Sequence, residues 1–234
     1  MTITHDDLTT VANDARQRVD LWVDVITRTD ARRVAEIGVF RGAFAEKLLG
    51  RCPAITEYYM IDPWRHLEDW NKPANKDSKK FDEIFEEAMA KTAEHAERRI
   101  VLRGRTSEVV DEIPDGHLDL AYIDGDHTLR GISIDLIRVW DKIRPNGWIA
   151  GDDFSKSIWQ HGQSFEPTMV FPFAVYFAEA VGCPIYALPF QQFLIEKDPE
   201  RGFSFTDLTG SYPGIDVLSQ FSQARRRRGP AQQA

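Results

Sequence analysis

The sequence has almost none of the residues that build disulfide frameworks or zinc sites. It contains two cysteines, Cys52 and Cys183, each beside a proline and neither at the spacing of a metal-ligand motif. Isolated cysteines of this kind are typical of a reducing compartment. We therefore expect free thiols and a cytoplasmic protein.

Long apolar runs are also missing, and the opening MTITHDDLTT has no basic segment followed by an apolar core. We therefore expect no membrane partner and no secretion signal. Positive charge is scarce as well, since 29 lysines and arginines face 37 aspartates and glutamates, giving a net charge of -8. Because nucleic-acid binding depends on clustered positive charge, we expect no nucleic-acid partner.

The length and composition fit one domain. A chain of 234 residues that is 42% hydrophobic is long enough for one well-buried core and short for two. The single basic run, Arg225 to Arg228, stands near the end of the chain, where we predict a disordered tail rather than a binding patch. The composition leaves the formation of a homo-oligomer open.

Short apolar runs alternate with amphipathic stretches through most of the chain. Apolar residues from Leu8 to Ile26, after a Thr4-x-x-Asp7 start typical of a capping box, predict one N-terminal helix. This alternation predicts an α/β fold, a three-layer Rossmann-like sandwich whose sheet is mostly parallel with an antiparallel strand near the C-terminus. The expected strands are 32–39, 57–62, 98–104, 118–124, 147–153, 184–189 and 191–197, and the expected helices are 40–50, closed by Gly50, then 81–89, 129–143 and 173–181.

Acidic residues follow two of the expected strands. The run LDLAYIDGDH ends in Asp124, Asp126 and His127, and GWIAGDD ends in Asp152 and Asp153. Polar residues past the carboxyl ends of neighbouring parallel strands face a shared crevice. Crowded carboxylates resist ionisation unless a cation or a proton relieves them. The pattern therefore indicates a divalent metal site or an acid/base site.

A second motif lies between the first expected strand and its helix, in AEIGVFRGAF. Gly38 and Gly42 allow a ligand to approach the backbone closely, and Asp62 ends the next strand, where an acidic residue can hold ribose hydroxyls. Phe40 replaces the middle glycine of a dinucleotide motif, which disfavours a diphosphate. Glu36 adds negative charge, which suits a cationic ligand such as the sulfonium S-adenosylmethionine.

Together these motifs resemble those of class I S-adenosylmethionine-dependent methyltransferases over residues 30–197. The matching elements are E-x-G-x-x-x-G at 36–42, Asp62, YIDGDH at 122–127 and GDD at 151–153. They are most similar to the metal-dependent O-methyltransferase branch, which includes the catechol and caffeoyl-CoA enzymes and the sugar O-methyltransferases of macrolide and aminocoumarin biosynthesis. YIDGDH lacks the lysine of the catechol enzymes, which favours an alcohol on a sugar or polyhydroxylated metabolite.

The resemblance also implies roles for individual residues. For Mg²⁺ or Mn²⁺ the ligands would be Asp124, Asp152 and Asp153, because hard cations prefer oxygen. The proton acceptor would be His127 or Asp126; we favour His127 because an ordinary histidine pKa of about 6.5 lies near working pH. The residues implied at the cofactor are Glu36, Gly38 and Gly42 for its methionine part, Asp62 for its ribose, Arg105, Thr106 and Ser107 near its adenine, and Asp124 beside it.

Several of these residues have a simpler structural interpretation. Asp126 could cap the following helix, and the glycines could serve only tight packing. Three residues of the polar segment 63–80 could cover adenine or substrate, or belong to a flexible insertion: Trp64, His66 and Trp70. The isolated His161 fits a solvated loop residue.

The leading hypothesis is an S-adenosylmethionine-dependent, metal-assisted O-methyltransferase acting on a small molecule. The alternatives are a metal-independent methyltransferase, perhaps acting on nitrogen, and a non-catalytic module that binds S-adenosylmethionine. The sequence divides into an N-terminal helix in 1–30, the methyltransferase domain in 31–200 and a C-terminal extension in 201–234.

Overall fold

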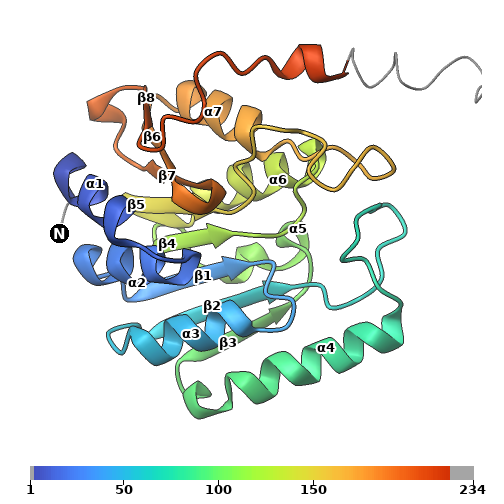
Figure 1. The fold of residues 1–234 in the computed structure, drawn as a ribbon. Coiled ribbons are helices and arrows are strands. Elements are labelled where there is room, and N and C mark those ends of the chain that lie inside the picture. The colour runs from blue at the N-terminus through green and yellow to red at the C-terminus, as the bar shows by residue number, and fades with distance from the viewer. Residues whose placement is uncertain (1–2, 222–234) are drawn as a thin grey trace, which may run out of the picture.

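One sheet of eight strands organises the computed structural model, which describes residues 3–221 (Figure 1). The strand order is β3-β2-β1-β4-β5-β7-β6-β8, and β7 runs antiparallel to both of its neighbours. The strands are β1 (Arg33–Ile37), β2 (Glu57–Asp62), β3 (Arg99–Arg103), β4 (Leu118–Ile123), β5 (Ile143–Gly151), β6 (Pro184–Leu188), β7 (Gln192–Glu196) and β8 (Ser204–Asp207). The expected three-layer, mostly parallel α/β fold is confirmed.

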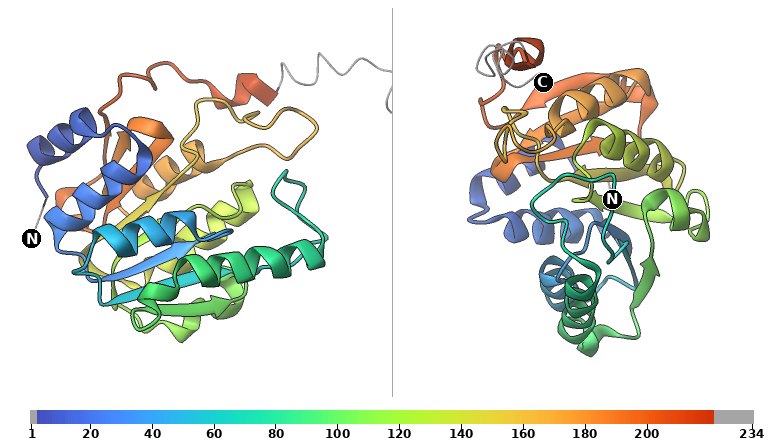
Figure 2. Two further views of the ribbon diagram at one scale, coloured as in Figure 1. Left: turned by 60° about the horizontal axis from the view of Figure 1, so that its bottom comes forward. Right: turned by 90° about the vertical axis from the view of Figure 1, so that its right-hand side faces the viewer.

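Helices cover both faces of the sheet (Figure 2). On one face α1 to α4 pack against side chains such as Tyr58 and Leu120, and on the other α6 and α7 pack against neighbours such as Tyr59 and Ala121. Both faces of the central strands are buried, as expected for parallel strands. The helices are α1 (His5–Asp14), α2 (Arg18–Thr29), α3 (Ala43–Arg51), α4 (Ser78–Lys91), α5 (Thr106–Val109), α6 (Leu129–Trp140) and α7 (Val170–Ala180).

The prediction of one N-terminal helix is wrong, because the chain forms α1 and α2 with a break between them. Ala15 and Gln17 are extended at the break. The capping box at Thr4 and Asp7 is present. Apolar residues on both sides of the break keep a helical spacing, so periodicity alone could not show it. The break makes Arg18 the first residue of α2.

Other differences concern element ends. Gly50 lies inside α3, and Ile143 begins β5 instead of extending α6. Leu129 is half exposed, so it does not belong to the buried face of α6. β8 was not expected, and it joins part of the C-terminal extension to the sheet beside β6. The predicted disordered tail around Arg225 to Arg228 lies outside the described residues.

The carboxyl ends of β1, β2, β4 and β5 meet at one edge of the sheet. Two long segments, residues 63–77 and 152–169, extend from this edge (Figure 1). Backbone and side-chain hydrogen bonds join them, including those from the Asn71 backbone nitrogen to Glu166 Oε2 at 2.8 Å and from Lys72 Nζ to the Glu166 carbonyl at 2.8 Å. Within residues 3–221, every helix is too short or too polar to cross a membrane.

Candidate active site

A cavity of about 490 Å³ opens at this edge of the sheet. Its walls come from the ends of β1, β2 and β4, from the start of α5 and α6, and from the two long segments. Gly42 and Asp152 are absent from its lining. The sequence-predicted residues that line it are Glu36, Gly38, Asp62, Arg105, Thr106, Ser107, Asp124, Asp126, His127 and Asp153.

Gly38 lets two strand ends come together at the floor of the cavity. Its φ of +90° suits glycine, and a Cβ atom there would lie 2.0 Å from the Asp124 carbonyl oxygen. The Asp124 backbone nitrogen in turn donates to the Ile37 carbonyl at 2.7 Å. Gly42 has a different role, because its Cβ would lie 2.9 Å from Ala88 in α4. It permits helix packing and lies outside the cavity wall.

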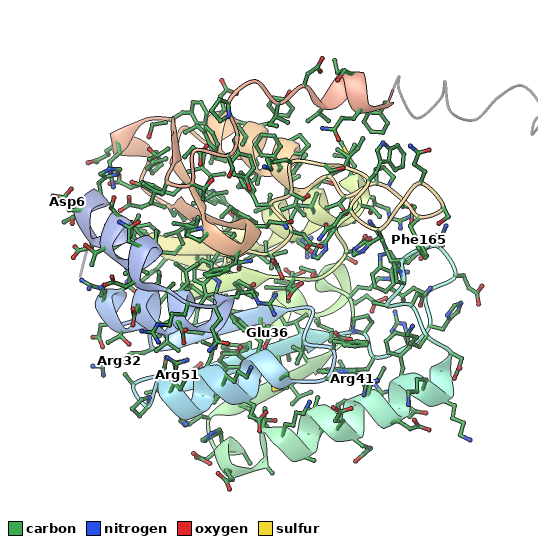
Figure 3. All side chains as sticks on the ribbon, in the orientation of Figure 1. Asp6, Arg32, Glu36, Arg41, Arg51 and Phe165 are labelled. Atoms are coloured by element: carbon green, nitrogen blue, oxygen red, sulfur yellow. The ribbon has the colours of Figure 1, made fainter. Side chains whose placement is uncertain are left out.

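Two buried carboxyl groups stand at this end of the cavity, which we name the cofactor end. Glu36 lies in the interior (Figure 3) and accepts a hydrogen bond from the Tyr58 hydroxyl at 2.7 Å. Asp62 accepts hydrogen bonds from the backbone nitrogens of Phe40 at 2.8 Å and Trp64 at 2.7 Å. Burial raises the pKa of Glu36 to about 8 and that of Asp62 to about 6. A ligand with cationic or hydroxyl groups would restore the interactions that burial removes.

The β3–α5 turn closes the cofactor end. Thr106 is buried, and Arg105 is the N-cap residue before α5, with its backbone nitrogen donating to Glu108 Oε2 at 2.9 Å. Arg105 Nε is buried and has no hydrogen-bond partner among residues 3–221. Arg105, Thr106 and Ser107 line the cavity on the β3 side, whereas Asp153 follows β5 on the opposite side.

The other end of the cavity, which we name the acidic end, contains Asp124, Asp152, Asp153, Arg18 and His127. Arg18 Nη1 lies 3.0 Å from Asp124 Oδ2 and forms a very short contact with Asp152 Oδ2. His127 Nδ1 pairs closely with Asp153 Oδ2, and His127 Nε2 lies 3.6 Å from Asp124 Oδ1. The structure thus brings the three aspartates together around two organic cations.

Neighbouring charges shift the pKa values at the acidic end. Burial, and then the nearby Asp152, raises the pKa of Asp124 to about 7. Burial also opposes the charged forms of Asp153 and His127, but the hydrogen bond between them outweighs it. The pKa of Asp153 therefore falls to about 2, and that of His127 rises to about 9. His127 Nε2 is buried without a hydrogen-bond partner among residues 3–221.

The six carboxylate oxygens of these aspartates already face nitrogen atoms of the protein. Asp152 Oδ1 accepts from Gln192 Nε2 at 2.5 Å and from the Asp153 backbone nitrogen at 2.8 Å, and Asp153 Oδ1 accepts from Gln160 Nε2 at 2.6 Å. Arg18 and His127 face the other oxygens. Within residues 3–221, no group of three or more His, Cys, Asp or Glu side chains is arranged to hold a metal ion. The predicted set of Mg²⁺ or Mn²⁺ ligands does not fit this arrangement.

Asp126, the other candidate base, is held by its surroundings. Its Oδ1 accepts from Trp70 Nε1 at 3.0 Å and from the Thr128 backbone nitrogen at 3.0 Å. Arg130 Nη2 lies 3.8 Å from its Oδ2. Thr128, rather than Asp126, caps α6 by accepting from the Gly131 nitrogen. Asp126 therefore shapes the turn before the helix and anchors Trp70 at the cavity wall.

The remaining aromatic and histidine candidates separate by position. Trp64 is fully buried against Phe85, with ring centroids 5.1 Å apart, and does not line the cavity. His66 is exposed and pairs with the Lys76 carbonyl. Trp70 and His161 both line the cavity. Arg18 and Gln192 were not foreseen at this site, and no local motif marks either of them.

Comparisons with known proteins identify a family and a fold for this chain. A family described as a methyltransferase domain matches residues 35–154, which contain Glu36, Asp62 and the three aspartates. No curated protein is similar enough in sequence to count as a match.

Several solved structures share the fold. One is an O-methyltransferase from Bacillus cereus in complex with SAH, at a TM-score of 0.56 and 14% identity, covering 82% of this chain and 90% of that chain. Another is the O-methyltransferase TomG from Streptomyces achromogenes in complex with SAM, at 0.54 and 15%, covering 84% and 91%. A third is SAH-bound PaMTH1 from Podospora anserina, at 0.52 and 14%, covering 82% and 88%. At such identities the likeness shows the fold.

Proposed function

We propose that this chain, which belongs to the methyltransferase-domain family that its residues 35–154 match, transfers the methyl group of S-adenosylmethionine to a hydroxyl oxygen of a small molecule. The observation that carries the proposal is His127: its Nδ1 is held by Asp153, its buried Nε2 has no hydrogen-bond partner within residues 3–221, and the residue lines the cavity. This is the arrangement of a general base oriented by a carboxylate.

The cofactor end suits S-adenosylmethionine. Glu36 and the glycine cradle at Gly38 would hold its methionine part, Asp62 its ribose, and residues 105–107 would lie near its adenine. When bound, S-adenosylmethionine supplies a methyl carbon whose bond to the sulfonium sulfur breaks as its bond to the acceptor oxygen forms, leaving a neutral thioether. Glu36 and Asp62 favour this cation because they are buried acids that gain an opposite charge or a donor.

In its neutral form, which becomes the major one only above its pKa of about 9, His127 would accept the proton of the acceptor hydroxyl at Nε2. Hydroxyls are poor nucleophiles at neutral pH, so removal of this proton is the task that the chain's own residues must perform. Asp153 fixes the imidazole and stabilises the imidazolium that forms, as a carboxylate does for a catalytic histidine. Residues of the segments 63–77 and 152–169 line the cavity, and we name these two segments its roof. Figure 3 labels Phe165 in the second segment. The roof would exclude water and orient the acceptor.

A metal-assisted form of the reaction is the second candidate. Its support is the convergence of Asp124, Asp152 and Asp153 at one end of the cavity. It would require Arg18 and His127 to release these carboxylates. A sugar or another polyhydroxylated metabolite fits both forms, because it offers a hydroxyl and because YIDGDH lacks the lysine of the catechol enzymes.

The test combines calorimetric titration of S-adenosylmethionine with a methyl-transfer assay over matched panels of small alcohols, sugars and amines. We expect donor binding, release of S-adenosylhomocysteine and a methyl ether product. Donor binding without turnover on any panel would favour the non-catalytic module. Methylation confined to the amines would show that the accepting atom is nitrogen rather than oxygen. Absence of donor binding would overturn the proposal.

A further inference from the structure

Arg18 reaches the acidic end from outside the matched region. It is the first residue of α2, and the break after α1 directs its side chain toward the ends of β4 and β5. Its guanidinium carbon also lies 5.0 Å from the centre of the Phe44 ring, within the range of a cation–π contact. Two anions and an aromatic face therefore hold one arginine in place.

The guanidinium of Arg18 lies between Asp124 and Asp152, two of the aspartates that were predicted to share a metal ion. Its Nη1 alone contacts Asp124 Oδ2 and Asp152 Oδ2, one oxygen from each strand end. A divalent cation would need these oxygens, because Mg²⁺ and Mn²⁺ are held by carboxylate and other oxygen ligands. The other Asp152 oxygen is occupied by Gln192, which itself accepts from Trp22 Nε1 and the Tyr122 hydroxyl, each at 2.8 Å.

We infer that the guanidinium of Arg18 replaces a divalent metal in this chain. It cross-links the ends of β4 and β5, neutralises part of the charge of Asp124 and Asp152, and so positions the acidic end for reaction without a metal ion. An arginine suits this role because it keeps its charge when partly buried and presents several donors in a fixed plane. Arg18 is a positioning residue, acting through the two aspartates.

The first test is metal binding, measured by titrating MnCl₂ alone. We expect wild type to show no stoichiometric Mn²⁺ site. Arg18→Met, which removes the charge but keeps an apolar stem against Phe44, should gain a stoichiometric Mn²⁺ site, at least about tenfold tighter than any weak binding to wild type. The double variant Arg18→Met, Asp152→Asn should lose that gain. Arg16→Met, at an exposed arginine two residues earlier, is the matched control and should behave as wild type.

Two outcomes of the titration would overturn the inference. One is a Mn²⁺ site in wild type that disappears in Asp152→Asn. The other is an Arg18→Met protein, folded by circular dichroism, whose Mn²⁺ binding equals that of wild type. This arm does not depend on catalysis, so it remains decisive if the proposed function fails.

The second test is activity, and this part of the inference rests on the proposed function. We expect wild-type methyl transfer to persist in excess chelator. Arg18→Met should lower the rate about tenfold or more, and Arg18→Lys should restore part of it. Wild-type activity that chelator abolishes and Mn²⁺ restores would contradict the inference, as would full activity in Arg18→Met. Failure of the donor to bind at all would instead refute the proposed function.

Discussion

The two ends of the cavity are built in different ways. The cofactor end comes from the ends of β1 and β2 and from the β3–α5 turn, and its carboxyl groups on Glu36 and Asp62 are held by neutral donors. The acidic end gathers side chains from α2, the β4–α6 turn and the segment after β5, and joins them through ion pairs to Arg18 and His127. Among residues 3–221, neither Glu36 nor Asp62 forms an ion pair with a cationic side chain, whereas the aspartates of the acidic end pair with Arg18 and His127.

This difference indicates which end meets which ligand. Buried acids with raised pKa values are best stabilised by a cationic ligand, and the sulfonium of the donor is such a ligand. The charges of the acidic end are balanced by its own residues. This end therefore suits a neutral acceptor with a hydroxyl proton better than a cationic ligand. At that end the buried His127 Nε2 has no hydrogen-bond partner in the part of the chain that the structure describes.

The largest expected effect is the loss of stability and donor binding when the cofactor end is altered at Gly38. Gly38→Ala would place a methyl group on the Asp124 carbonyl, so we expect the free energy of unfolding to fall by about 3 kcal/mol or more and donor binding to be lost. Gly116→Ala is the matched control, because Gly116 also has a positive φ but no atom within 4 Å of its Cβ position. It should cost only about 1 kcal/mol. Chemical denaturation and donor calorimetry measure both, and equal losses in the two variants would contradict this account.

A moderate effect is expected at the acidic end, on the pH dependence of the rate. In the proposed reaction neutral His127 is the base, and its pKa of about 9 means that the rate in wild type should rise with pH up to about that value. Asp153→Asn removes the anion that raises this pKa. Burial, which lowers the pKa of His127, is then opposed only by the more distant Asp124 and Asp152, so this pKa should fall and the rise in rate should move to lower pH. Single-turnover rates across pH measure the shift, and an unchanged profile in Asp153→Asn would show that His127 is not the titrating base.

The smallest effect concerns the roof of the cavity. Trp70→Phe keeps the aromatic ring but removes the hydrogen bond to Asp126, which is worth about 1 kcal/mol. We expect KM for the acceptor to rise about fivefold, with donor affinity unchanged. Steady-state kinetics and donor calorimetry check the split. A larger effect on the donor than on the acceptor would assign Trp70 to the cofactor end.

The features that depend on residues close together in the chain could be predicted from the sequence. Glu36 lies in β1 two residues before Gly38, and Asp62 directly ends an apolar run. Buried parallel strands are apolar on both faces, so the positions of these residues follow from short-range patterns. The same reasoning located the strand ends that carry Asp124 and Asp152. The mostly parallel sheet and its antiparallel strand also followed from the alternation of apolar runs and amphipathic helices.

The parts that depend on distant contacts could not be predicted. Arg18 lies 106 positions before Asp124 in the chain, and Gln192 lies 40 positions after Asp152. Neither stands in a motif, so their pairing appears only when the strands are assembled. The break before Arg18 is hidden because apolar spacing continues across it. The sequence therefore indicated a charged cluster that needs a cation, but not that the chain supplies its own.

The most direct test of the central claim is the behaviour of His127→Asn. This variant should bind S-adenosylmethionine with the wild-type Kd, because His127 lies at the acidic end, while the single-turnover rate of methyl transfer to a hydroxyl acceptor falls by about 10²–10⁴-fold. Asp126→Asn should lose less than about tenfold, since Asp126 anchors Trp70 and the turn before α6. A His127→Asn enzyme that keeps its rate, or that loses the donor instead, would contradict the account.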